Sequence, residues 1–162
     1  MIIRKATISD IPQILSIYNY EVLNSSSTFD TRPKSTEDFL KFFDLHSFKY
    51  PIYVVEDSSK FIIGYGCLSP FSDKEGYSIT VEDSIYINHL HRGKGIGKML
   101  LKFLIEKARE NGFKNIIAKI CAENQPSLNL HKSLGFVEVG KLYSVGYKFG
   151  RYLDVVILQL NL

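Results

Sequence analysis

The stretch from His91 to Leu100, HRGKGIGKML, is the one place where glycine recurs at every second position and then stops as an apolar helical pattern begins. Glycine accepts positive φ and lets a ligand approach the main chain, so such a turn can point several backbone N–H groups at one place. A helix behind the turn adds partial positive charge at its amino end. The stretch therefore predicts a phosphate cradle, the alternative being a tight turn whose glycines serve only packing.

The segments on either side of the turn predict a strand, a helix and a second strand. Residues 77–88, YSITVEDSIYIN, alternate between an apolar and a polar parity, and Glu82 falls on the polar one. Behind the turn, apolar residues recur at helical spacing until Asn111-Gly112 supplies a stop signal. The run NIIAKICA at 115–122 follows as a buried strand. A helical crossover of this length predicts that strands 77–88 and 115–122 pair in parallel.

The remaining patterns extend this unit in both directions. Before it, we expect a strand at 2–4, a helix capped by Ser9, a second helix from a Ser35/Asp38 capping box to Leu45, and a hairpin of PIYVVEDS with KFIIGYGCLS. After it, we expect a short helix in ENQPSLNLHKSLGF and two strands, FVEVGKLYSV and YLDVVILQL, joined across GYKFGR. The order β-α-α-β-β-β-α-β-α-β-β predicts one α+β domain over residues 1–162, with a mixed sheet of about seven strands.

The composition is that of an ordinary globular protein, with 162 residues of which 45% are hydrophobic and 23% charged. The net charge of +3 is too small to argue for nucleic acid, and Lys and Arg are spread along the chain. No run approaches membrane-spanning length, and the amino terminus has no targeting pattern. Cys67 and Cys121 lie in apolar runs without CxxC spacing, so we expect reduced, buried thiols in a cytoplasmic protein.

Two nucleotide-binding motifs fit the glycine turn poorly. A Walker A loop needs Gly-Lys followed by Ser or Thr, whereas here Gly95 follows one Gly-Lys pair and Met99 follows the other. A dinucleotide fingerprint needs G-x-G-x-x-G in the first strand-helix unit, whereas this G-x-G-x-G comes late, after several antiparallel strands. The turn therefore calls for a different phosphate ligand.

The turn resembles the R-x-x-G-x-G signature of the GNAT superfamily of acetyl-CoA-dependent N-acetyltransferases, with Arg92, Gly95 and Gly97 at the signature positions. The expected element order is similar to that of the superfamily over essentially the whole chain. Within it, the sequence looks closest to the phosphinothricin and methionine sulfoximine acetyltransferase branch. The stretches that carry this resemblance are IYNYEVLNSSSTFDTRP, VEDSIYIN, HRGKGIGKMLL, AENQPSLNLHKSLGF and VGYKFGRYLDVVILQL.

The resemblance implies an N-acetyltransferase that moves an acetyl group from acetyl-CoA to the amino group of a small amino acid analogue, by direct attack in a ternary complex. It also implies a homodimer, and no metal is expected. The coenzyme contacts that it implies are Ile85, Tyr86 and Ile87 at the thioester, Arg92, Gly93, Lys94, Gly95, Ile96, Gly97 and Lys98 at the pyrophosphate, and Asn124 and Ser133.

Direct transfer requires a neutral amine, although a free amino group is mostly protonated near neutral pH. Glu82 matches the glutamate that this branch uses as general base, the alternative being a solvated carboxylate paired with a lysine. Where many superfamily members have a tyrosine that protonates the leaving thiolate, this chain has His131, which can donate a proton or serve a structural role. A covalent acetyl-cysteine route would need an accessible, activated thiol, and neither cysteine has an adjacent base in the sequence.

The resemblance places the acceptor pocket in the loop after the first helix and in the segment before the Glu82 strand, which supply Phe29, Lys74, Glu75 and Tyr77. Lys74 or Arg32 could hold a substrate carboxylate or phosphinate, or each could be a solvated charge. The KFGRYLD stretch departs from the KHGRWHD form of many phosphinothricin enzymes and looks closer to the methionine sulfoximine and sulfone type. Acetylation of a peptide amino terminus or a polyamine, and a non-catalytic acyl-CoA sensor, are the alternative functions.

Overall fold

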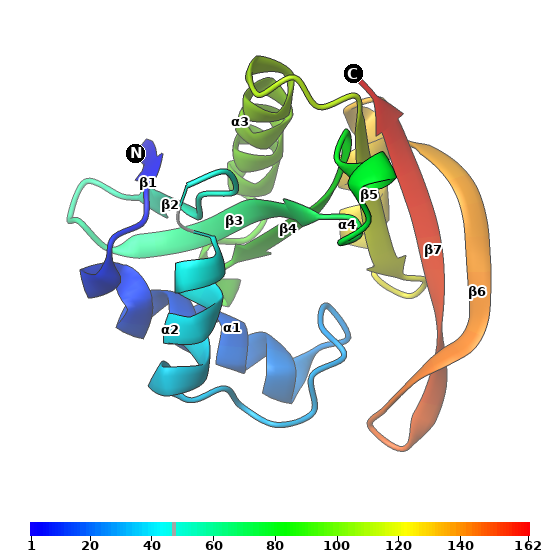
Figure 1. The fold of residues 1–162 in the computed structure, drawn as a ribbon. Helices are drawn as coiled ribbons and strands as arrows, with labels where there is room; N and C mark the ends of the chain where they lie inside the picture. The colour runs from blue at the N-terminus through cyan, green and yellow to red at the C-terminus, as the bar shows by residue number, and fades with distance from the viewer. Residues whose placement is uncertain (47) are drawn as a thin grey trace.

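The computed structural model describes residues 1–46 and 48–162, and over these residues the chain forms a seven-stranded mixed sheet flanked by four α-helices (Figure 1). The strand order is β1-β2-β3-β4-β5-β7-β6. The strands are β1 (Ile2–Lys5), β2 (Tyr53–Glu56), β3 (Ile62–Pro70), β4 (Thr80–Ile87), β5 (Asn115–Cys121), β6 (Val137–Lys148) and β7 (Arg151–Asn161). The helices are α1 (Ile11–Asn24), α2 (Thr36–Leu45), α3 (Ile96–Glu110) and α4 (Gln125–Ser133). The predicted α+β class and element order are confirmed.

The helices form two cores on opposite faces of the sheet. On one face, α1 and α2 bury side chains such as Ile14 and Phe39 against Tyr65 of β3. On the other face, the apolar stripe of α3, which includes Leu101 and Leu104, packs on the sheet. Apolar side chains at helical spacing give each helix one buried face, which fixes the side that it turns to the sheet. Among the described residues, no helix is both long and apolar enough to cross a membrane.

The second helix begins as predicted and the first does not. Ser35 Oγ accepts the Asp38 backbone N–H at 3.1 Å, and the Asp38 carboxylate accepts the Ser35 N–H at 3.0 Å, which confirms the capping box. Ser9, in contrast, lies inside a short 3-10 turn, η1 (Ile8–Asp10), so its predicted cap is wrong. The buried Asp10 carboxylate satisfies this turn instead, because it accepts the Thr7 N–H at 2.7 Å.

The central strands β4 and β5 pair in parallel, as predicted, but only over three residues. Their register ends at Glu82 opposite Ile117, although β4 continues to Ile87 and β5 to Cys121. Beyond that point β4 remains paired with β3 and β5 remains paired with β7. The two halves of the sheet therefore part between β4 and β5 and leave an opening in the middle of the molecule.

Two predicted strand limits are wrong. The strand expected from Tyr77 begins at Thr80, because residues 75–77 form a separate 3-10 turn, η2 (Glu75–Tyr77). At the other end of the chain, β6 and β7 extend through most of the GYKFGR stretch, which was expected to be a connection. Only Phe149 and Gly150 form the turn, with φ of +53° and +74°, and two positive φ values suit the right-handed twist of a tight hairpin. The hairpin is accordingly long and narrow (Figure 1).

Candidate active site

The glycine-rich turn has the geometry of an anion cradle. Gly93 and Gly95 have φ of +74° and +78°, and a Cβ at either position would meet no atom within 4 Å. Gly95 is the N-cap of α3, and the first helical hydrogen bond runs from the Met99 N–H to the Gly95 carbonyl at 3.0 Å. The N–H groups of Ile96, Gly97 and Lys98 therefore point forward without a helical carbonyl partner. Open space in front of free N–H groups at a helix amino end suits a phosphate.

Gly97 has a different role in the same turn. A Cβ there would lie 3.2 Å from Leu130 Cδ2 and 3.7 Å from Ile87 Cγ1. This glycine allows the first turn of α3 to approach α4 and the end of β4 closely. The alternation of glycine therefore combines ligand access at two positions with packing at the third.

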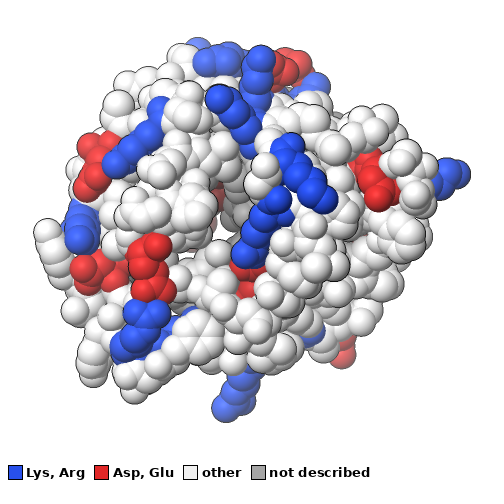
Figure 2. All heavy atoms as spheres, turned by 180° about the vertical axis from the view of Figure 1, so that it is seen from behind, with Lys and Arg blue, Asp and Glu red and all other residues white. Residues whose placement is uncertain are grey.

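A cavity of about 440 Å³ opens where β4 and β5 part, and the cradle forms one end of it. Figure 2 shows that the molecule is hollowed on this side, with Lys and Arg side chains above and to the right of the hollow and Asp and Glu side chains below it. The residues of the predicted coenzyme site that line it are Ile85, Tyr86, Ile87, Arg92, Gly93, Gly95, Ile96, Gly97, Lys98 and Asn124. The structure thus brings together segments from β4, α3 and α4 that lie far apart in the sequence.

Two predicted coenzyme contacts lie outside this cavity lining. Lys94 is exposed, and its ammonium reaches the Leu90 carbonyl at 3.5 Å. Ser133 is in the last turn of α4, where its hydroxyl donates to the Leu130 carbonyl at 2.7 Å. The sequence patterns place both residues near the right elements, but their side chains turn toward local carbonyl groups.

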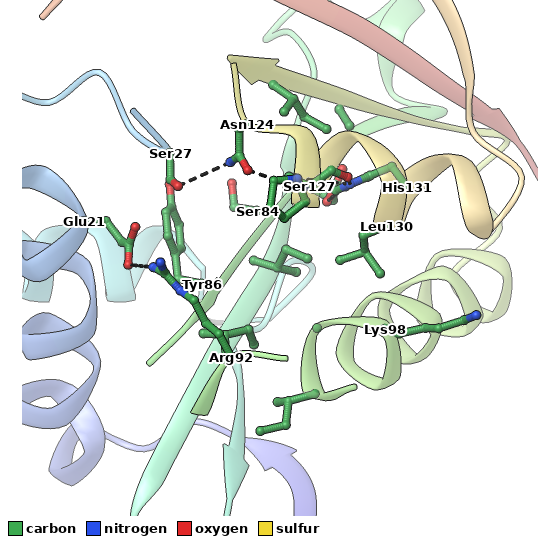
Figure 3. A pocket seen from close by; sticks show the side chains of 18 of the residues that line it. Glu21, Ser27, Ser84, Tyr86, Arg92, Lys98, Asn124, Ser127, Leu130 and His131 are labelled. Atoms are coloured by element: carbon green, nitrogen blue, oxygen red, sulfur yellow. Dashed lines mark hydrogen bonds and ion pairs between the residues drawn. The ribbon is translucent and has the colours of Figure 1, made fainter. Parts of the chain in front are cut away.

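Arg92 forms an ion pair with Glu21, which comes from α1 (Figure 3). The Glu21 side chain is buried, and its second oxygen accepts the Ser25 hydroxyl at 2.6 Å. Arg92 is half exposed and lines the cavity. The guanidinium therefore links the cradle to α1 in the wall of the cavity. Glu21 was missed in the sequence, where its place among apolar helical residues gives no signal of a function.

Asn124 caps α4 and also faces the cavity. Its side-chain oxygen accepts the Ser127 N–H at 3.2 Å, and its amide nitrogen donates to Ser27 Oγ at 3.4 Å across the cavity (Figure 3). The cap fixes the direction of α4. The second bond brings the loop after α1 to the same wall.

His131 is held by a buried partner that sequence reasoning missed, Asp83 of β4. The His131 Nε2 atom lies 3.0 Å from Asp83 Oδ2, and Nδ1 lies 2.8 Å from the Ser127 carbonyl oxygen. Both side chains are only 2% exposed. The Asp83 carboxyl group and the Ser127 carbonyl oxygen both offer acceptor oxygens, so the arrangement suits the imidazolium form, in which both ring nitrogens donate. Burial alone would lower the pKa of His131, but the hydrogen bond and charge of Asp83 outweigh it and raise that pKa.

Glu82 lies at the point where β4 and β5 stop pairing, and it is not among the residues that line either cavity. Its Oε1 atom accepts the Lys119 ammonium at 2.5 Å, and Lys119 lines the cavity. By strand alternation Glu82 shares a face with Ser84 and Tyr86, whereas Asp83 points to the opposite face, toward α4. The proposed base and His131 therefore stand on opposite sides of the opening between the strands.

The predicted acceptor contacts are not gathered at this cavity. The Phe29 ring packs on Gly146 of β6, where a Cβ would overlap it. Residues 74–77 lie in the exposed η2 turn, and the Tyr77 ring packs against Phe71 at 5.3 Å between centroids. Lys74, Glu75, Tyr77 and Phe29 are absent from the lining of the cavity, as is Arg32.

A second cavity, of about 530 Å³, lies between α1, α2 and the outer face of β3 and β4. It shares Ser84 and Tyr86 with the first cavity, so the two meet on the face of β4 that carries Glu82. At its rim the Tyr18 hydroxyl donates to Asp30 at 2.5 Å, and Lys34 lies 3.3 Å from the same carboxylate. This cavity offers an approach to β4 from the side opposite α3 and α4.

The cysteines do not support covalent transfer. Both are free and buried, as expected. Burial raises the pKa of the Cys67 thiol to about 12, so the reactive thiolate is scarce at neutral pH. Cys121 lines the first cavity but, like Cys67, is buried without an adjacent base in the sequence.

The parted sheet and the cradle together define a class of protein, an acyl-CoA-dependent N-acyltransferase. The chain belongs to the GNAT acetyltransferase family, because the model of the acetyltransferase (GNAT) domain matches residues 3–157. Over 161 residues it is 40% identical to an L-methionine sulfoximine/L-methionine sulfone acetyltransferase of Pseudomonas aeruginosa, covering 99% of this chain and 94% of that protein.

Solved structures agree with this placement. A GNAT superfamily phosphinothricin acetyltransferase of Sinorhizobium meliloti in complex with AcCoA has a TM-score of 0.95 and 37% identity, covering 99% of this chain and 88% of that one. A ribosomal-protein-alanine N-acetyltransferase of Brucella melitensis has a TM-score of 0.97 and 38% identity, covering 100% of both chains. The protein is an acetyl-CoA-dependent N-acetyltransferase, and acetyl-CoA is its co-substrate.

The residues present fit acetyl-CoA. The space in front of Gly93 and Gly95 is open and can hold a pyrophosphate, whereas a side chain at either position would occupy it. The unpaired edges of β4 and β5 leave backbone groups free for an extended pantetheine arm. Lys98 lines the cavity at the first turn of α3 but extends away from the other labelled side chains in Figure 3, so it can meet a phosphate only at the outer end.

Proposed function

We propose that this protein acetylates the α-amino group of a small amino acid of the methionine sulfoximine, methionine sulfone or phosphinothricin kind. The single observation that carries the proposal is Glu82, a carboxylate placed where β4 and β5 part and in contact with Lys119, which lines the cavity. The named activities of the Pseudomonas aeruginosa and Sinorhizobium meliloti relatives support the choice of substrate class.

In the proposed reaction, bound acetyl-CoA supplies the acetyl group as a thioester, and the new C–N bond forms as the C–S bond breaks. Glu82 accepts the proton that the acceptor ammonium must lose before its nitrogen can attack. Backbone N–H groups of residues 85–87 stabilise the negative charge that develops on the carbonyl oxygen. His131 gives its Nε2 proton, shared with Asp83 in the resting protein, to the departing thiolate. The cradle residues and Asn124 hold the coenzyme in place.

A thiol-release assay over a panel of amines tests this proposal. We expect turnover of acetyl-CoA with L-methionine sulfone, L-methionine sulfoximine or phosphinothricin, and acetylation of the amine confirmed by mass spectrometry. Tight acetyl-CoA binding with no turnover of any amino acid analogue would instead support a non-catalytic acyl-CoA sensor and would contradict the proposal.

A second candidate function is acetylation of a peptide amino terminus, favoured by the likeness to the Brucella melitensis ribosomal-protein-alanine N-acetyltransferase. A peptide terminus lacks the α-carboxylate of a free amino acid and needs an open groove for the following residues. Comparing turnover of a free amino acid with turnover of an alanine-terminated peptide separates the two functions.

We also propose a cytoplasmic homodimer, each subunit a single GNAT domain over residues 1–162 that needs neither nucleic acid nor membrane. The support for the dimer is the edge strand β6, which carries a row of exposed apolar side chains. An uncovered apolar edge strand has unpaired backbone groups that can pair with another chain. The exposed large hydrophobic residues of the β6–β7 hairpin are Val137, Val139, Leu142, Tyr143, Val145, Tyr147, Phe149 and Tyr152.

A further inference from the structure

Lys119 is the cation that contacts the proposed base. Its ammonium donates to Glu82 Oε1 at 2.5 Å and lies 5.5 Å from the centroid of the Phe71 ring. The same side chain lines the cavity between β4 and β5. A positive charge therefore stands beside the carboxylate oxygen that must take the proton of the acceptor.

The sheet register explains how Lys119 reaches this place. Ile117 is the last residue of β5 that pairs with β4, and its partner is Glu82. Lys119, two residues further along, points to the same face of the sheet and spans the gap that opens beyond that pair. The Lys119 side chain is 46% exposed, and exposed ion pairs are worth little to stability. The contact can therefore be exchanged for a contact with a ligand.

Other nearby cations are committed to protein partners. The buried Lys148 ammonium donates to the carbonyls of Ser25 and Thr28 at 2.7 and 2.8 Å. The Arg151 guanidinium is held by both oxygens of the Glu123 carboxylate, at 2.8 and 2.9 Å. Within the part of the chain that the structure describes, Lys119 alone combines a place in the cavity wall with a contact to Glu82.

We propose that Lys119 binds the carboxylate of the acceptor, so that Glu82 and Lys119 together form a receptor for a zwitterionic α-amino acid. This inference rests on the proposed function and names its substrate class. The ammonium and carboxylate of an α-amino acid are separated by a single carbon, which matches two opposite charges in contact. On binding, the acceptor ammonium replaces Lys119 at Glu82 and the acceptor carboxylate takes Lys119. The exchange frees the Glu82 oxygen to accept the ammonium proton.

The same arrangement disfavours the other acceptor classes. A polyamine or a peptide amino terminus offers an ammonium without an α-carboxylate, so nothing draws Lys119 away from Glu82. Such an acceptor has to break the Glu82–Lys119 pair without a replacement for it. Lys119 therefore acts as a specificity-determining residue as well as a neighbour of the base.

The experiment compares L-methionine sulfone with its α-carboxamide as acceptors for the parent protein and for Lys119→Met, which removes the charge and keeps a side chain of similar length. We expect Lys119→Met to lower kcat/KM for the acid roughly ten- to hundredfold, and for the amide by less than about threefold. Lys119→Arg should restore part of the preference for the acid.

Lys107→Met is a matched control. The Lys107 ammonium on α3 also pairs with a carboxylate, that of Glu110 at 2.6 Å, and it lies 5.4 Å from the centroid of the Phe103 ring. It does not line the cavity, so both acceptors should react as with the unsubstituted protein. If Lys119→Met lowers kcat/KM equally for the acid and the amide, the inference is overturned. The same holds if the parent protein acetylates the acid and the amide with equal kcat/KM. In either case the proposed function stands. If the parent protein binds acetyl-CoA but acetylates neither these compounds nor any other amino acid analogue of the panel, the proposed function itself fails and the inference falls with it.

Discussion

Glu82→Gln tests the base directly. The substitution keeps the size of the side chain but removes its ability to accept a proton, so kcat should fall roughly a hundredfold or more. The acetyl-CoA dissociation constant, measured by calorimetry, should stay nearly unchanged because the cradle is made by other residues. Glu37→Gln on α2 is the control, since Glu37 also pairs with a lysine, Lys41 at 3.5 Å, but lies on the outer surface. An unaltered pH–rate profile in Glu82→Gln would remove Glu82 from the base role.

Asp83→Asn tests the partner of His131 through stability as a function of pH. The folded-state pKa of His131 is raised, so the pair stabilises the protein fully below the unfolded histidine pKa of about 6.5 and loses this effect as pH rises through the folded value. Asp83→Asn should therefore cost roughly 1–3 kcal/mol near pH 6 and less at pH 9, measured by urea unfolding.

The control for Asp83→Asn is Asp73→Asn, an exposed carboxylate in the loop before η2. It should leave the free energy of unfolding unchanged at both pH values. A loss in Asp83→Asn that does not vary with pH would show that His131 is neutral in the folded protein and that Asp83 serves only packing.

These two carboxylates show what the sequence can predict about single residues. Glu82 could be proposed as the base from the sequence because it lies on the polar parity of a strand and in a stretch similar to a known branch. Asp83 was missed because its partner, His131, comes from α4, 48 residues away, and the contact depends on how α4 packs. Lys119 was missed for the same kind of reason, since its place beside Glu82 follows from the β4–β5 register. Lys74 and Arg32, the predicted cations, lie outside the cavity lining.

Gly95→Val tests the cradle at the start of α3. The positive φ of Gly95 strains a β-branched residue, and the new side chain would occupy the open space in front of the turn. Acetyl-CoA affinity should fall roughly tenfold or more, by analogy with the loss of a charged hydrogen bond. Gly95→Asn separates the two effects, because asparagine tolerates this backbone region while still filling the space.

Gly76→Val is the control for the cradle, because a Cβ at Gly76 also meets open space but its φ is not positive and it lies in η2. It should leave coenzyme affinity unchanged. Calorimetry that shows normal acetyl-CoA binding in both Gly95 variants would contradict the cradle assignment.

Lys148→Met tests how β6 holds the carboxyl end of α1. The Lys148 ammonium is buried, which lowers its pKa, and it donates to the carbonyls of Ser25 and Thr28. Removing it leaves these partly buried acceptors without their ammonium donor and should cost roughly 1–3 kcal/mol of unfolding free energy. Hydrogen exchange should accelerate at residues 25–30. Lys141→Met, on the same strand but half exposed, is the control; equal exchange in the two variants would contradict the role of Lys148.

The elements themselves follow well from local patterns, and their limits follow less well. The Ser35 box and the Asn111-Gly112 stop are confirmed because their signals are local. The GYKFGR stretch was expected to connect two strands, but four of its six residues pair in the hairpin, and only Phe149 and Gly150 turn. Strand pairing supplies the hydrogen bonds there, which overrides the turn composition.

The molecule as a whole adds one property that neither the site nor its elements contain, an apolar edge. The hairpin of β6 and β7 carries Tyr143 and Tyr152, which are 72% and 73% exposed, on an edge of the sheet. Lys148 of β6 holds the loop after α1, and Ser27 of that loop lines the cavity, so a partner that covers β6 would also contact the strand that holds this wall. The proposed dimer and this wall of the cavity are thereby linked through one strand.

We therefore expect a dimer that depends on the outer surface of β6. The double substitution Tyr143→Lys with Val145→Lys adds two charges to exposed positions of this edge strand, and charged side chains on an edge disfavour pairing with another chain. Sedimentation equilibrium should show a dimer for the parent protein and a monomer for the double variant.

The matched control replaces Leu23 and Phe61 by lysine. Both residues are also exposed but lie outside the hairpin, so the dimer should stay intact. A parent protein that stays monomeric at all concentrations, or a double variant that stays dimeric, would rule out an interface on β6. In the double variant, a raised KM for the acceptor in the thiol-release assay, with unchanged acetyl-CoA affinity by calorimetry, would show that the edge strand is coupled to the cavity wall.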